Sequence, residues 1–199
     1  MAALGFRFVR DICYEMLLAD GVLRLALYEV DDEPAGFVAY TARSVGFHRV
    51  ALRRHWPRVV WGVITAIASD PRRALRLVRA LRVVGSRRTH LAHERDPLGE
   101  VVCLAVRRRF LGSRFVRQTR LRVSEELELH ALERLRETGV SRVRMFVDTD
   151  NRAALVLHHR LGARFERSEL GGAPQLLVWF DFEADPEAAP MQERPGPFE

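Results

Sequence analysis

Hydrophobic and polar positions repeat with two different periods along this chain. In some segments apolar residues recur every three to four positions, which predicts amphipathic helices. In others they form short runs rich in Val and Leu, which predict strands. Gly21 and Gly139 each follow a helical pattern that they can end. The expected elements are a helix at 3–19, strands at 23–30, 35–42 and 101–106, a helix at 124–138, a strand at 143–147, a helix at 152–161 and a strand at 175–182.

The order of these elements predicts an α+β protein. Two strands joined by Asp31-Asp32-Glu33-Pro34 form a hairpin whose loop is expected to be longer than the tightest kind. The strand–helix units that follow favour a mixed sheet. We expect a single domain over 1–183, interrupted by a helical insertion at 43–98, and a disordered tail at 184–199 because that segment is rich in Pro and acidic residues.

The segment from Asn151 to Phe165 carries the most specific pattern. Asn151 can cap a helix by accepting a hydrogen bond from an exposed backbone N–H group. Gly162 stands where a left-handed residue commonly ends a helix. Between them, one face of the predicted helix carries Ala154, Leu157, His158 and Leu161.

This strand, Asn-capped helix and Leu-Gly sequence resembles the last strand–helix unit of the GNAT superfamily of acyl-CoA N-acyltransferases. The family pattern there is Asn-x-x-Ala-x-x-(aliphatic or aromatic)-Tyr-x-x-Leu-Gly-Phe. His158 stands where the family usually has Tyr, and Ala163 where it usually has Phe. The matching positions are Asn151, Ala154, Leu157, Leu161 and Gly162.

The resemblance implies a GNAT-like fold, a mixed and mostly antiparallel sheet flanked by helices. It implies acetyl-CoA as co-substrate and acetyl transfer by direct attack of a primary amine on the thioester, with a small molecule or sugar as the expected acceptor. Two features depart from the family. The family normally opens with a strand before its first helix, whereas this sequence begins almost at that helix, so either the strand is absent or the start is misassigned; and the insertion at 43–98 replaces a short connection.

Two residues are candidates for proton transfer. The segment Glu100 to Val106 is similar to the Glu-Ile-Val-Phe-Cys-Ala-Val strand of the histone-acetylating branch, in which the leading Glu is the general base. The resemblance assigns this role to Glu100; the alternative is a surface Glu at a strand start. His158 is the candidate acid that protonates the leaving thiolate, and the alternative is a core histidine.

The resemblance also implies which residues bind the cofactor. Backbone groups of Cys103, Leu104, Ala105 and Val106 would pair with the pantetheine arm. The family's phosphate loop, Arg/Gln-x-x-Gly-x-Gly/Ala, is degraded here, because Arg114 stands in place of its last Gly. Arginines can bind phosphates by charge-assisted hydrogen bonds instead. A solvated basic loop without CoA is the alternative. The candidates are Arg107, Arg108, Arg109, Gly112, Ser113, Arg114 and Asn151, with Arg117, Arg120 and Arg122 beyond them.

Composition changes this picture little. All 32 Lys+Arg residues are arginine and the formal net charge is +6, which fits either anionic partners or codon bias in a GC-rich genome. Cys13 and Cys103 are expected to be reduced core residues of a cytoplasmic protein, and we expect no metal site. No cleavable signal sequence is evident, and the apolar run Val59 to Ala68 is too short to span a bilayer.

The insertion offers a second function class. Arginines alternate with apolar residues after Asp70-Pro71, and Trp56 and Trp61 precede them. Such basic amphipathic helices form a flap or acceptor wall, or lie on an anionic membrane; nucleic-acid binding is not expected, because no recognition motif is present. A non-catalytic GNAT-like module that docks on a membrane surface is therefore the alternative function. The sequence specifies neither the acceptor amine nor the oligomeric state.

Overall fold

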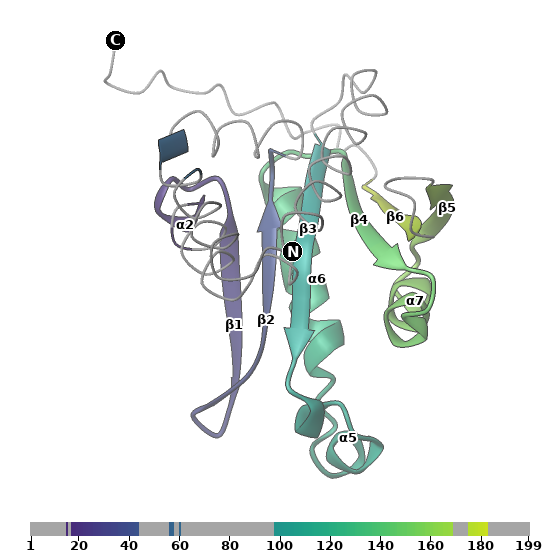
Figure 1. The fold of residues 1–199 in the computed structure, drawn as a ribbon. Coiled ribbons are helices and arrows are strands. Elements are labelled where there is room, and N and C mark those ends of the chain that lie inside the picture. Colours follow the sequence, from purple (N-terminus) through teal and green to yellow (C-terminus); the bar gives the residue numbers. More distant parts are fainter. Residues whose placement is uncertain are drawn as a thin grey trace.

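The described residues form a six-stranded sheet with helices packed against it (Figure 1). This computed structural model describes residues 15, 17–43, 56–57, 60, 98–168 and 175–182. The strand order is β1-β2-β3-β4-β6-β5, and every neighbouring pair is antiparallel except β3 and β4. The sheet is therefore mixed and mostly antiparallel, which confirms the predicted α+β class. The strands are β1 (Arg24–Val30), β2 (Glu33–Thr41), β3 (Leu98–Val106), β4 (Arg142–Asp148), β5 (Arg164–Ser168) and β6 (Gln175–Asp181).

The hairpin between β1 and β2 is tighter than the sequence suggested. Asp31 and Asp32 alone form the turn, and both have positive φ, 50° and 60°. Two consecutive left-handed residues make the two-residue turn that matches the twist of paired strands, and Asp tolerates that conformation. The predicted four-residue loop was wrong because Pro34 belongs to β2, where it lies opposite Glu29 beside an irregularity in the register.

The longest described helix, α6 (Val123–Glu137), covers one face of the sheet. It packs on β2 and β3 and, less extensively, on β1, behind these strands in the view of Figure 1. Val123, Leu127, Ala131 and Leu135 form its buried stripe. A Cβ on Gly36 of β2 would lie 2.8 Å from the carbonyl oxygen of Ala105, so a glycine allows this close packing.

Helix α7 (Arg152–Arg160) follows β4 with the predicted caps. The Asn151 side chain accepts from the Ala154 backbone N–H at 3.2 Å, and Gly162 has φ +84°. The other helices described are short: α2 (Leu17–Ala19), the 3₁₀ helix η3 (Arg108–Phe110) and α5 (Ser113–Thr119). No helix within the described ranges is long and apolar enough to cross a membrane.

Three elements were missed by the sequence patterns, namely η3, α5 and the edge strand β5. Leu98 begins β3, so it does not belong to the insertion that was predicted to end there. The predicted helix at 3–19 lies outside the described residues except at its end, in α2. Most of the 43–98 insertion, Cys13 and the 184–199 tail also lie outside the described residues.

Candidate functional site

Strands β3 and β4 are neighbours for only part of their length. They pair from Leu98 to Glu100 on one strand and from Arg142 to Arg144 on the other. Beyond that point the two strands diverge, as Figure 1 shows. A cavity of about 460 Å³ lies at this opening. Its lining comes from β3 (101–106), the end of β4 (145–148), Leu111, Ser124 and Glu128, and the start and inner face of α7 (Asn151, Ala153, Ala154, Leu157 and His158).

The backbone of β3 presents unpaired polar groups to this cavity. Arg107 N–H donates to the Ala35 carbonyl at 2.8 Å, so these two residues form a hydrogen-bonded pair between β3 and β2. Because hydrogen-bonded and non-hydrogen-bonded pairs alternate in an antiparallel ladder, the N–H and C=O groups of Leu104 and Val106 point the other way, toward β4. The end of β4 has diverged from these groups, so an extended ligand can pair with them as an added strand does.

His158 contacts a buried carboxylate in the cavity wall. Its Nδ1 lies 2.6 Å from Glu128 Oε1, and the two residues are 5% and 0% exposed. The ring also packs edge-on against Phe180, with centroids 6.4 Å apart. Glu128 Oε2 has no hydrogen-bond partner among the described residues. His159, the next residue, faces outward and stacks on Phe165.

Glu128 was missed by sequence reasoning although a signal was present. It stands three, four and seven residues before Ala131, Leu132 and Leu135, all buried on the inner face of α6. A carboxylate on the apolar face of a helix is rare without a partner or a role. The position of Glu128 on the apolar face of the helix was the signal that could have identified it as a site residue.

Glu100 lies at the vertex of the opening, where β3 and β4 stop pairing. It is 4% exposed, so it is not the surface residue of the alternative interpretation. Its Oε2 accepts from Arg144 Nε at 3.1 Å and from Nη2 at 2.9 Å, and Arg144 is 2% exposed. Arg144, too, was missed. Neither residue lines the cavity, so the structure does not bring Glu100 and His158 into one cluster.

The two candidates approach the opening from opposite faces of the sheet. Gly99 lies beneath α6, where an added Cβ would contact Leu135 at 3.2 Å. Side chains alternate along a strand, so the neighbouring Glu100 points to the other face. His158 bonds Glu128 of α6 and therefore lies on the α6 face. A ligand that passes through the opening can be reached from both sides.

The segment after β3 carries the candidate phosphate ligands at its surface. Arg107 Nη1 donates to Glu33 Oε1 at 2.7 Å, and Arg109 also pairs with Glu33. Gly112 precedes α5 with an ordinary φ of −69°, and an added Cβ there would meet only the Arg109 carbonyl, 4.0 Å away. Ser113 begins α5. Arg108 and Arg114 are exposed and form no ion pair within the described part of the chain.

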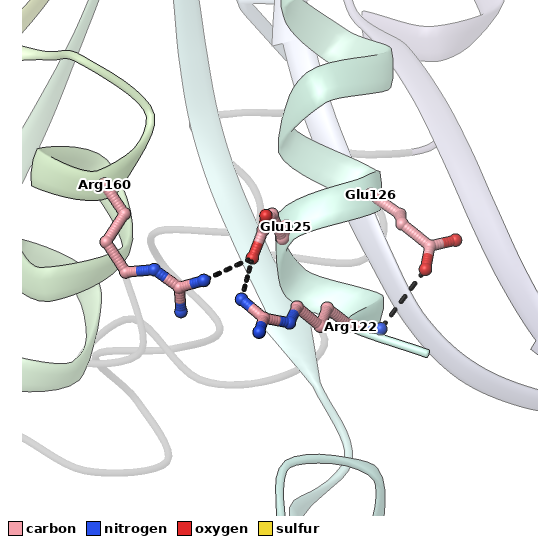
Figure 2. A network of polar contacts seen from close by, with 4 residues as sticks. All are labelled: Arg122, Glu125, Glu126 and Arg160. Atoms are coloured by element: carbon pink, nitrogen blue, oxygen red, sulfur yellow. Dashed lines mark hydrogen bonds and ion pairs between the residues drawn. The ribbon is translucent and has the colours of Figure 1, made fainter. Parts of the chain in front are cut away.

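The N-terminus of α6 is occupied by its own carboxylates (Figure 2). Glu126 Oε1 accepts from the Arg122 backbone N–H at 3.2 Å. Glu125 Oε2 pairs with Arg122 Nη1 at 3.2 Å and with Arg160 Nη2 of α7 at 3.4 Å. Negative charge is favourable at a helix N-terminus, so Glu125 and Glu126 offset part of the field that attracts anions, although the only backbone N–H that they bond among the described residues is that of Arg122. An incoming phosphate would have to compete with them here.

Tyr28 supports this arrangement from β1. Its hydroxyl donates to Glu126 Oε2 at 2.5 Å. This hydrogen bond, then burial, then the charge of Glu126 raise the pKa of Tyr28 from 10.0 to about 12. The pKa is raised in the folded state, so the stabilisation is complete below the unfolded value and is lost as pH rises from 10.0 to about 12.

Comparing the wild type with Tyr28→Phe tests this pH dependence. The free-energy advantage of the wild type should be constant from about pH 7 to 9 and should shrink above about pH 10, measured by urea unfolding. An advantage that stays constant up to about pH 11 would contradict the assignment.

The described residues contain no group of three His, Cys, Asp or Glu side chains that could hold a metal ion. Cys103 is a free thiol, partly buried, in the cavity wall.

Comparisons with known proteins show which solved structures resemble this fold. No family model and no curated protein matches the sequence. The aminoglycoside acetyltransferase AAC(6')-Ib, solved with coenzyme A and kanamycin, is similar in structure with a TM-score of 0.52 and 11% identity over 88% of this chain and 76% of that one. A GNAT-family putative acetyltransferase from Desulfovibrio desulfuricans gives 0.49 at 11% identity (86% and 77%), and the NatC complex bound to Gag peptide and CoA gives 0.48 at 12% (86% and 79%). The likeness to AAC(6')-Ib shows that the described residues have the fold of an acetyltransferase, which is the GNAT-like α+β fold that the resemblance implied.

Proposed function

We propose that this chain is an acyl-CoA-dependent N-acetyltransferase that transfers acetyl from acetyl-CoA to a primary amine of a small molecule or sugar. The observation that carries the proposal is the opening between β3 and β4. It combines unpaired backbone groups, a cavity of about 460 Å³ and a buried His158–Glu128 pair in the wall. The pantetheine arm of CoA is extended and rich in amides, so it fits the unpaired backbone groups of β3. The His158–Glu128 pair suits the proton transfers that amide formation requires.

The residues present fit a CoA thioester at both of its ends. Backbone groups of Leu104 and Val106 would pair with the pantetheine arm. Those of Cys103 and Ala105, which the sequence also predicted, point to β2 instead, so these two residues contribute only to the cavity lining. Arg107, Arg108, Arg109 and Arg114, with the Gly112–Ser113 backbone and Asn151, would hold the phosphates. Arg107 and Arg109 would have to exchange Glu33 for phosphate. Exposed ion pairs are worth only about 0–1 kcal/mol, so this exchange is cheap beside charge-assisted bonds to a pyrophosphate.

The proposed reaction is direct attack. Glu100, or a water, takes a proton from the acceptor ammonium, so that a free amine attacks the thioester carbon. Backbone N–H groups of β3 polarise the carbonyl oxygen. His158 protonates the departing thiolate. Both bonds from Arg144 go to Glu100 Oε2, so the proton transfer would have to take place beside this ion pair.

The alternative function predicted from the sequence is a non-catalytic module that docks on a membrane surface. Its motif lies in the 43–98 insertion, mostly outside the described residues. Nothing in a surface-docking role calls for a buried histidine–carboxylate pair in a cavity wall, so the described residues favour the enzyme.

A thiol-release assay tests the proposed reaction. Acetyl-CoA is incubated with the protein and with primary amines one at a time, including amino sugars and short peptides, and free CoA is followed with a thiol reagent. We expect release that depends on one class of amine and an acetylated product of matching mass. If acetyl-CoA binds but no amine accelerates release above the protein-only blank, the catalytic proposal fails.

A further inference from the structure

We propose that Glu128 is the positioning residue of His158, and that this pair moves a proton from the attacking nitrogen to the leaving sulfur. The inference rests on the proposed function for its chemistry, but its geometric part is independent of it. Both side chains line the cavity, and their contact joins α6 to α7 across 30 residues of sequence.

The contact determines which ring nitrogen is available. An ionised carboxylate only accepts, so with Glu128 ionised the proton of the 2.6 Å contact with its Oε1 lies on His158 Nδ1. Nδ1 is thereby occupied, and in the neutral ring Nε2 is left with its lone pair. Glu128 thus selects one tautomer and, with the ring of Phe180 at 6.4 Å, holds the imidazole in one orientation.

The surroundings of the ring leave Glu128 as its electrostatic partner. The neighbouring residues of β4 and β6 that face the α6 side are apolar: Met145, Val147, Val178 and Phe180. The other titratable groups in the cavity lining are Cys103 and Asp148, and Asp148 accepts a hydrogen bond from Gln175 at 2.7 Å. Arg160, at the end of α7, pairs with Glu125 instead. Glu128 has one hydrogen bond, to His158, and a buried second oxygen without a partner among the described residues.

A carboxylate in that situation stabilises a positive charge on the ring. The idealised sequence balances as follows. The free amine attacks, the C–N bond forms, and the nitrogen becomes cationic. Nε2 takes its proton, and the imidazolium is stabilised by Glu128 beside Nδ1. The C–S bond then breaks, Nε2 returns the proton to the sulfur, and the ring is neutral again. The earlier ammonium proton leaves through Glu100 or water, so no other reactant is needed.

Heteronuclear NMR of isotope-labelled histidine tests the geometric part without substrate. The seven histidines can be sorted by the signal that disappears in His158→Gln. We expect His158 of the wild type, at a pH where the ring is neutral, to carry its proton on Nδ1. In Glu128→Gln the signals should move toward a mixture of tautomers, since an amide can either accept or donate. Glu137→Gln, at the exposed end of the same helix, should leave them unchanged.

Kinetics test the chemical part. Glu128→Gln should lower kcat about 10- to 100-fold, as loss of a residue that orients an active group does, with KM for acetyl-CoA within about twofold. The double variant with His158→Gln should be no slower than His158→Gln alone, because the two residues act as one unit. An additive loss would contradict this.

The outcomes separate the two proposals. A wild-type His158 protonated on Nε2 overturns the inference whether or not the protein transfers acetyl groups. An unchanged kcat in Glu128→Gln overturns the positioning role. The expected tautomer in a protein that binds acetyl-CoA but acetylates no amine overturns the proposed function and the proton relay, and leaves only the structural pair.

Discussion

Replacing His158 by Gln should lower kcat for acetyl transfer by roughly 10²- to 10³-fold, within the range of a lost general acid or base. Gln can still donate to Glu128, so the buried carboxylate keeps a hydrogen bond and the fold should survive. KM for acetyl-CoA should change little, because most of the proposed binding groups are on β3 and the arginine segment. Steady-state thiol release measures both constants, and circular dichroism checks the fold.

His159→Gln is the matched control. It is the next residue on α7, faces outward, and stacks on Phe165 with centroids 6.4 Å apart. We expect its kcat to equal that of the wild type. If His158→Gln retains wild-type kcat, His158 is only a buried structural histidine, which is the alternative that the sequence left open.

The second large effect is on stability: Arg144→Met should destabilise the fold by about 3–5 kcal/mol, the cost typical of breaking a buried ion pair from one side. Met approximates the length of the side chain, but it removes the guanidinium that makes two bonds to Glu100 Oε2. The carboxylate is then left 4% exposed without that positive charge. Urea unfolding measures the loss.

Two further variants show whether charge causes the effect. Adding Glu100→Gln to Arg144→Met should recover part of the stability, since the buried negative charge is gone. Arg142→Met, two residues earlier on β4, removes an exposed pair with Asp181 and should cost no more than about 1 kcal/mol. If Arg144→Met costs no more than Arg142→Met, the buried pair contributes no net stability.

Much of the fold could be predicted because its signals are local. The cap at Asn151 and the left-handed Gly162 depend on residues within one helix, and both were confirmed. The edge strand β5 was missed because it is five residues long and carries Arg164, Glu166 and Arg167, which resemble a loop. Charged side chains are common on edge strands because they discourage pairing with other chains. The hairpin loop was misjudged because Pro34 was read as part of the turn.

The site could be predicted only in part, because its partners are distant in sequence. The lining strand and His158 came from one family pattern each, and both lie in the cavity wall. No family pattern predicted the charged partners of the candidate residues: Glu128 is 30 residues from His158, and Arg144 is 44 residues from Glu100. Such pairings depend on which elements the sheet brings together. The pattern that assigned a role to Glu100 therefore gave no warning that an arginine would already hold it.

The central claim is that the opening between β3 and β4, with the arginines beyond it, binds acetyl-CoA. A calorimetric titration of the purified full chain with acetyl-CoA, and with dephospho-CoA beside it, tests this most directly. We predict one site with a Kd in the micromolar range, about −8 kcal/mol, and weaker binding of dephospho-CoA because an arginine loses a phosphate partner. No heat or binding at about millimolar acetyl-CoA, with a protein shown by circular dichroism to be folded, would contradict the account.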